Sequence, residues 1–481
     1  MSFIYYDGDN ADSSGSQEDM EKKLHHYRRI IRKKNYGEEN APSIDILEGI
    51  VQYCLEKERF TDAMEFCQVL LEFNPYSSDA WLKKAIILIN LDAPLEAIDA
   101  IEYCLIYNPG DEEALFYKGI ALSQLGYNEE SIEIFDHILM LDSENEELLF
   151  QKAITLEIMG RYEEAIEIFK FLARSESFKK DAFQELAYCY QCLDNIDKAE
   201  DFYKKAIDDD PYDYELWYNL ALLYFQDGQN NKAIECFEMT LAIKDDYFMA
   251  WVNIAKIFCI LNKFQDAILH YKEAIKLNPD DLETQQNLAN VYNDSGNYVE
   301  AIAVYTQLIK DNPDLPSLYF ARGMCYDTIE QFEKALSDYN KALSLDSENP
   351  SLWYAKADLL NNLKKIKEAV QCYKKVIVLQ PNNYDCLEDL GKIYLDMKRI
   401  EDAKKIFKKM IELFPKRYEG YAFMAIAFAM LNDVSKAADY YKNAIKLDLL
   451  IGFSLRSDFS QILSPKDYRK FKAILNANTN K

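Results

Sequence analysis

Few residues in this chain have the types and spacing that chemistry requires. Cys189 and Cys192 form a single CxxC motif inside a predicted helix. A metal or redox site built on such a motif needs a second cysteine pair or a nearby histidine, and neither is present. We therefore expect both thiols to be structural. The four histidines are His25, His26, His137 and His270, and the last two fall on predicted helices that face away from the groove described below.

Other catalytic and metal-binding patterns are equally weak. Asp7, Asp9 and Asp12 alternate like the carboxylates of a calcium loop, but the glycine and the terminal glutamate do not follow at the required spacing. The chain has no GxxxxGK(S/T), HExxH, GxSxG or GxGxxG motif, so the usual signals for phosphate, zinc, acyl-transfer and dinucleotide chemistry are missing. We expect no enzyme activity, no catalytic residue, no metal and no cofactor.

Charge and hydropathy restrict the partners. The formal net charge of the 481 residues is −27 at pH 7, whereas binding to nucleic-acid phosphates needs clustered Lys and Arg. The longest apolar run, 421–431, is far shorter than the ~20 residues that cross a bilayer, and residues 1–6 do not resemble a signal peptide. We expect a cytoplasmic protein that binds neither nucleic acid nor membrane, with its ten cysteines reduced.

A 34-residue period runs from 44 to 451 without insertion or deletion. Its first column is mostly large and apolar: Leu47, Trp81, Leu115, Leu149, Phe183, Trp217, Trp251, Gln285, Tyr319, Trp353, Leu387 and Tyr421. The column four residues later is small in all copies but the first: Val51, Ala85, Gly119, Ala153, Ala187, Ala221, Ala255, Ala289, Gly323, Ala357, Gly391 and Ala425. Small residues at a fixed register indicate close helix contact at the same place in each unit.

Each unit also carries two apolar stripes with helical spacing. In the unit that begins at 214, the first stripe is Trp217, Leu220, Ala221 and Tyr224. The second is Ala233, Cys236 and Phe237. Glycine or asparagine often stands between the stripes, which is typical of a helix end. We predict one helical hairpin per unit and no β-strand.

These residues resemble the tetratricopeptide repeat pattern, and the unit that begins at 214 shows it well. The first unit departs most, at Val51, Cys54 and Cys67. The resemblance implies an all-α fold, a right-handed superhelical solenoid of about twelve 34-residue helix-turn-helix repeats whose first helices line a concave groove. Members of this family mostly bind other proteins.

We divide the chain into four segments. Residues 1–18 are polar and expected to be disordered, and residues 19–43 form a basic helix whose charged face we expect to be solvated rather than an anchor for a membrane or partner. Residues 452–481 are expected to cap the stack, because the end of a repeat array needs a polar outer surface. The repeats occupy 44–451 and begin at 44, 78, 112, 146, 180, 214, 248, 282, 316, 350, 384 and 418.

Apolar residues occupy the non-stripe positions of the first helices in the N-terminal repeats. A repeat stack does not require them there, so we predict an apolar half of the groove. These residues are Leu82, Ile86, Phe116, Ile120, Phe150, Ile154, Ile158, Tyr188, Tyr218 and Phe225. An external partner, closure of the superhelix, the apolar run at 3–6 and self-association are all compatible with this pattern.

The same positions become polar in the C-terminal repeats. They are Asn219, Asn253, Lys256, Asn287, Asn290, Asn293, Asp294, Asp327, Asp358, Asn361, Asn362 and Asp396. Three of the amides share one column, where they could bond the backbone of an extended peptide. Carboxylates predominate over the single lysine, so we expect a cationic or neutral segment in this half.

The sequence therefore predicts an interaction scaffold that holds one or more proteins or peptides in a two-part groove. One alternative is a structural or assembly protein that forms a homodimer through the apolar half. A second alternative is a non-catalytic regulatory subunit of an enzyme.

Overall fold

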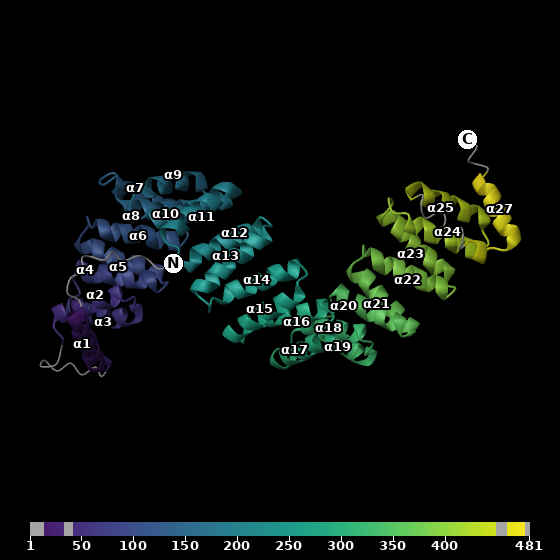
Figure 1. Cartoon of the computed structure of the whole chain (residues 1–481), viewed down its shortest axis with the longest axis horizontal. Helices are drawn as coiled ribbons and strands as arrows, with labels where there is room; N and C mark the ends of the chain where they lie inside the picture. Colours follow the sequence, from purple (N-terminus) through teal and green to yellow (C-terminus); the bar gives the residue numbers. More distant parts are fainter. Residues whose placement is uncertain (1–13, 33–41, 449–458, 477–481) are drawn as a thin grey trace. The chain divides into compact units, whose positions relative to one another are not determined.

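The computed structural model describes residues 14–32, 42–448 and 459–476. In these residues all regular secondary structure is helical, as predicted, and the chain divides into two compact units, Met1–Asp245 and Asp246–Lys481. Within each unit, successive helices lie side by side as pairs (Figure 1). Predictions for residues 1–13, 33–41, 449–458 and 477–481 lie outside the described part of the chain.

The first unit begins with α1 and continues with six helical hairpins. Its helices are α1 (Ser14–Arg32), α2 (Ile44–Glu56), α3 (Phe60–Phe73), α4 (Ser78–Asn90), α5 (Pro94–Tyr107), α6 (Glu112–Gln124), α7 (Asn128–Leu139), α8 (Glu146–Ile158), α9 (Tyr162–Leu172), α10 (Lys179–Cys192), α11 (Ile196–Asp209), α12 (Tyr214–Gln226) and α13 (Asn230–Ile243). Helix α1 begins inside the segment that the sequence predicts to be disordered.

The second unit has the same hairpin organisation. Its helices are α14 (Phe248–Ile260), α15 (Phe264–Leu277), α16 (Leu282–Asp294), α17 (Tyr298–Asp311), α18 (Pro316–Thr328), α19 (Phe332–Leu345), α20 (Pro350–Asn362), α21 (Ile366–Leu379), α22 (Tyr384–Asp396), α23 (Ile400–Leu413), α24 (Glu419–Met430), α25 (Val434–Leu447) and α27 (Pro465–Asn476).

In several repeats the residue of the first column ties the first helix to the turn before it. Trp81 Nε1 donates a hydrogen bond to the Pro75 carbonyl at 2.9 Å, six residues earlier. Gln285 Nε2 donates the equivalent bond to the Pro279 carbonyl at 2.6 Å, so an amide can replace an indole in this column because both present an N–H donor. The same bond is made by Trp217, Tyr319, Trp353 and Tyr421.

The small second column lies where the two helices of a hairpin cross. Ala85, Ala221 and Ala357 are fully buried. A Cβ atom added to Gly323 would lie 2.8 Å from the Tyr339 ring of α19, so there is no room for it unless the ring moves. The column therefore marks the closest helix contact, as the sequence predicts.

A left-handed residue ends the first helix of each described hairpin. Four of these positions hold glycine, namely Gly126, Gly160, Gly228 and Gly296. The remaining eight are Glu58, Asp92, Asp194, Asn262, Glu330, Lys364, Lys398 and Asn432. All twelve are spaced by 34 residues, so the described hairpins keep one register whatever side chain occupies the turn.

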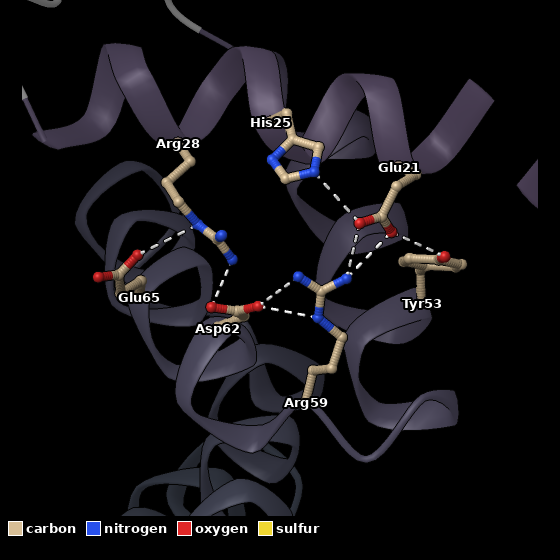
Figure 2. Close-up of polar contacts among 7 residues, drawn as sticks. All are labelled: Glu21, His25, Arg28, Tyr53, Arg59, Asp62 and Glu65. Atoms are coloured by element: carbon tan, nitrogen blue, oxygen red, sulfur yellow. Dashed lines mark hydrogen bonds and ion pairs between the residues drawn. The ribbon is translucent and has the colours of Figure 1, made fainter. Parts of the chain in front are cut away.

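Helix α1 covers the outer face of the first hairpin. Leu24 is fully buried there. Figure 2 shows a polar network beside it, in which Arg59 Nη1 lies 2.9 Å from Glu21 Oε1 and Arg28 pairs with Asp62. The hydrogen bond from Arg59 lowers the pKa of the Glu21 carboxyl. The prediction of a solvated basic face is therefore wrong for Arg28, whose side chain is 18% exposed.

Residues 459–476 pack against α25 at the C-terminal end of the second unit. Phe459 and Phe471 are fully buried, with ring centroids 4.5 Å apart. Both rings also pack edge-on against Tyr441 of α25, at 5.5 and 5.3 Å. This packing is what a cap for the last hairpin requires.

Candidate binding grooves

A groove of about 650 Å³ crosses the first helices of the first unit. Side chains from α4, α6, α8 and α10 line it, with the start of α12 at one end. Six of the predicted apolar residues belong to this lining, namely Ile86, Phe116, Ile120, Phe150, Ile154 and Ile158. The structure thus places these six residues, from three successive repeats, along one hollow.

Four other residues predicted for the apolar half do not line this groove. Leu82 is only 6% exposed and belongs to the hydrophobic core. The Tyr218 ring packs at a tilt against the buried Phe237 ring, with centroids 5.4 Å apart. Tyr188 is exposed and Phe225 is half-buried, and neither lines the groove.

The groove phenylalanines are also part of the hairpin packing. The Phe116 ring lies 6.2 Å from the fully buried Phe135, and the Phe150 ring lies 5.7 Å from Phe169 and 5.5 Å from Phe178. The exposed Ile158, by contrast, is 56% accessible. Ile158 is therefore the groove residue that can be changed at the smallest structural cost.

The sequence analysis missed the carboxylates of this groove. They are Asp92, Glu147, Asp181, Glu185, Asp213 and Glu215. One lysine, Lys180, also lines it, but its Nζ already lies 2.6 Å from Asp213 and 3.0 Å from Asp210. Four of the carboxylates stand at or near helix starts, where acidic residues are expected for capping alone, so residue type gave no sign of the groove.

Two of the acidic side chains meet across neighbouring first helices. Glu157 of α8 and Glu185 of α10 act on each other's carboxyl groups. Burial raises the pKa of Glu157 to about 7 and that of Glu185 to about 8, and the charge of Glu157 adds to the shift at Glu185. Both shifts favour the protonated carboxyls, because burial penalises the charged form and two adjacent carboxylates repel each other.

The CxxC motif lies beside this pair. The Cys189 thiol donates to Glu157 Oε2 at 3.6 Å, and burial raises the pKa of Cys189. Cys192 is exposed, and both thiols are free. Within the described residues, no group of His, Cys, Asp and Glu side chains could hold a metal ion.

Carboxylates also gather on the first helices of the second unit. Burial raises the pKa of Asp327, and the neighbouring Asp358 adds to the shift. Burial and Asp389 act in the same way on the pKa of Asp358. None of these three carboxylates forms an ion pair with a described Lys or Arg, so their charge is uncompensated by the part of the chain that is described.

Buried tyrosines hold several of the polar residues in place. Tyr305 donates to Asn290 Oδ1 at 2.5 Å and Tyr339 to Asp327 at 3.5 Å. The Asn293 amide lies 3.3 Å from Asp294. Periodicity identifies these tyrosines as core residues, but it does not show that their hydroxyls reach the polar positions of the first helices.

The remaining predicted polar residues have different surroundings. Asn219 belongs to the first unit, whereas Asn253 and Asn287 belong to the second. Asn253 is 7% exposed, which leaves little of its amide for a ligand, and Lys256 pairs with Glu283 at 3.3 Å. Asn361, Asn362 and Asp396 lie at the ends of their helices. Asn361 is half-buried, and the other two are exposed.

Comparison with known proteins identifies the repeats. Models described as tetratricopeptide repeat match residues 181–213, 202–235, 261–321, 316–349, 350–383 and 372–405. Curated proteins gave no match. The chain is thus an all-helical hairpin-repeat protein. Residues 181–235 and 261–405 carry tetratricopeptide repeats, and such repeats support a protein-interaction scaffold in general.

Solved structures share this fold over parts of the chain. The C-terminal part of a TPR repeat-containing protein from Cytophaga hutchinsonii is 18% identical, covers 50% of this chain and 99% of its own, and gives a TM-score of 0.45. YrrB, a TPR protein with an unusual peptide-binding site, is 16% identical over 41% of this chain and 97% of its own, with a TM-score of 0.34. The APC/C hetero-tetramer Cut9-Hcn1 is 11% identical over 88% and 97%, with a TM-score of 0.38.

No helix among the described residues is both long enough and apolar enough to span a membrane.

Proposed function

We propose that the first unit holds an apolar polypeptide segment of another protein in its groove. The observation that carries this proposal is the row of six apolar side chains from three repeats around one hollow of about 650 Å³. Burying an aliphatic or aromatic side chain gives roughly 1.5–3 kcal/mol. A partner that covers part of this row gains enough to offset the loss of freedom on association.

Charge favours an external segment over the apolar run at 3–6 of this chain. Residues 1–13 contain Asp7, Asp9 and Asp12 and no Lys or Arg. The groove lining is itself rich in carboxylates, and its single lysine is already paired. A segment that carries only acidic charge would therefore meet repulsion there.

For the second unit we propose contact with a cationic or neutral segment. Asp358 raises the pKa of Asp327, and Asp389 raises the pKa of Asp358, a repulsion that an approaching ammonium or guanidinium group would relieve. In this reading the protein is a scaffold with two chemically different binding faces. The homodimer and the regulatory subunit remain the alternatives.

A random-peptide phage library selected on the immobilised full-length protein tests the proposal. We expect selected peptides to be rich in large apolar residues. Ile158→Ser should weaken a synthetic selected peptide by roughly 10-fold or more, since about 1.5 kcal/mol of burial is lost. Ile106→Ser is the matched control, because Ile106 is 66% exposed and lies on α5 outside the groove lining.

The outcomes separate the alternatives. Peptides whose affinity does not change with Ile158→Ser contradict the groove assignment. Sedimentation equilibrium at several concentrations tests self-association, and a dimer that Ile158→Ser abolishes would favour the homodimer over an external segment. Deletion of residues 1–13 tests internal cover, because peptide affinity would then rise if that segment occupied the groove.

A further inference from the structure

The groove of the first unit has an unbalanced charge. Six carboxylate residues line it, while the one cation, Lys180, is held by Asp210 and Asp213. Burial also raises the pKa of Glu147 and of Asp181, although the charge of Lys180 acts against the shift at Asp181. A purely apolar occupant would exclude water from these groups and leave them without a counter-charge.

The Glu157–Glu185 pair lies next to the apolar lining. Glu157 is on α8 between Ile154 and Ile158 of the groove, and Glu185 itself lines the groove from α10. Neither carboxyl forms an ion pair with any Lys or Arg of the described chain. Cys189 and Asp181 of α10 act on the pair. The pair acts in turn on Tyr188 of α10, Tyr162 of α9 and Tyr203 of α11, whose pKa values it raises.

We propose that the segment held by the first unit carries a lysine or arginine side chain that binds at Glu157 of α8 and Glu185 of α10. This inference rests on the proposed function and names the chemistry of its partner. Because burial raises the pKa of both carboxyls, we expect the cation to displace a proton from the pair to the solvent as it binds.

The geometry suits such a side chain. The aliphatic stem of a lysine or arginine can lie along Ile154 and Ile158 while its charged end reaches the carboxyls. Hydrogen bonds between a cation and a carboxylate are stronger than neutral ones, and more so where water is excluded. The groove therefore selects an apolar segment that also contains a basic residue.

Calorimetry on the full-length protein tests the proton transfer. The probe is a synthetic peptide from the phage selection, compared with an analogue in which norleucine replaces its lysine or arginine. Titration at about pH 7 in buffers of different ionisation enthalpy measures protons released. We expect release of up to about one proton for the basic peptide and none for the norleucine analogue.

Site-directed variants test which carboxyl groups release the proton. The double variant Glu157→Gln/Glu185→Gln should abolish proton release and weaken the basic peptide roughly 10-fold or more, while leaving the norleucine analogue unchanged. Glu163→Gln is the matched control, since Glu163 is exposed on α9 and does not line the groove. Circular dichroism of both variants shows that the fold is retained.

The experiments distinguish a failure of the inference about the basic residue from a failure of the proposed function. Selected peptides without lysine or arginine, or equal affinity of the basic peptide and its norleucine analogue, would overturn the inference about the basic residue. The proposed function would still stand if those peptides depended on Ile158. Proton release that persists in the double variant Glu157→Gln/Glu185→Gln would also overturn the inference, because the proton would then come from a group outside the pair.

Discussion

The side chains that define the first groove act in more than one role. Phe116 and Phe150 pack on buried rings and also face the hollow. Glu185 lines the groove, and burial and the charge of Glu157 raise its pKa. Removing a groove residue can therefore also affect packing, so isosteric changes test the proposed function better than truncations do.

The carboxyl pair makes the stability of the first unit depend on pH. Burial raises the folded-state pKa of Glu157 and Glu185 to about 7 and about 8, above the unfolded value of about 4.3. The stabilisation from the protonated pair is therefore fully present below about pH 4 and is lost as pH rises through about 7 to 8. Glu185→Gln removes the part of this loss that comes from Glu185, because an amide cannot ionise, whereas Glu157 still titrates.

We predict that wild-type protein loses about 1–3 kcal/mol more stability between about pH 6 and pH 9 than Glu185→Gln does. Urea unfolding followed by circular dichroism at both pH values measures the difference. Glu163→Gln should behave like the wild type. Parallel pH dependence of wild type and Glu185→Gln would show that the pair is ionised at neutral pH in the folded protein.

At the scale of the helix and turn, the repeat tolerates unusual residues where glycine is preferred. Lys364 has a φ of 59° between α20 and α21. A residue with a Cβ atom is destabilised by about 1–2 kcal/mol in this conformation. Glycine avoids this penalty, but its greater freedom in the unfolded chain cancels part of the gain. The hairpin register, rather than the local side chain, therefore dictates the turn.

We predict that Lys364→Gly stabilises the second unit by about 0.5–1 kcal/mol. The neighbouring Lys365→Gly is the control, because Lys365 has a φ of −84° and gains nothing from glycine. That control should be neutral or destabilising. Chemical denaturation of the three proteins decides the matter, and a Lys364→Gly variant no more stable than the control would refute the strain at this turn.

The helices and their register could be predicted because each rests on a column of like residues. The turn positions of Glu330 and Lys398 could be found from register alone, since neither residue type indicates a left-handed backbone. The hydrogen bond of the first column could not be inferred from apolar character, although Gln285 in an aromatic column was a hint of it.

The groove was only partly predictable, for a geometric reason. Contacts between neighbouring first helices join residues that are not one period apart: Cys189 with Glu157, and Cys325 with Asn293, are each separated by 32 residues. Columns taken at 34 residues therefore show the apolar lining but hide pairs such as Glu157 and Glu185. The helix-start carboxylates were hidden as well, because capping explains them equally well.

At the scale of the whole molecule, the net charge of −27 and the groove chemistry agree. Both units present uncompensated carboxylates on their first helices. The acidic character of the chain is thus a property of its binding faces and not only of its solvated surface, which favours partners with basic segments.

Site-specific photo-crosslinking tests most directly whether the groove of the first unit is the binding face. Benzoylphenylalanine replaces Gln151, which lines the groove, or Ile106, which is exposed on α5 outside it. Each full-length protein is irradiated with the phage-selected peptide, and the product is identified by mass spectrometry. Crosslinking from position 151 and none from position 106 is the result we predict. A peptide that still binds but crosslinks from position 106 and not from position 151 would contradict the account.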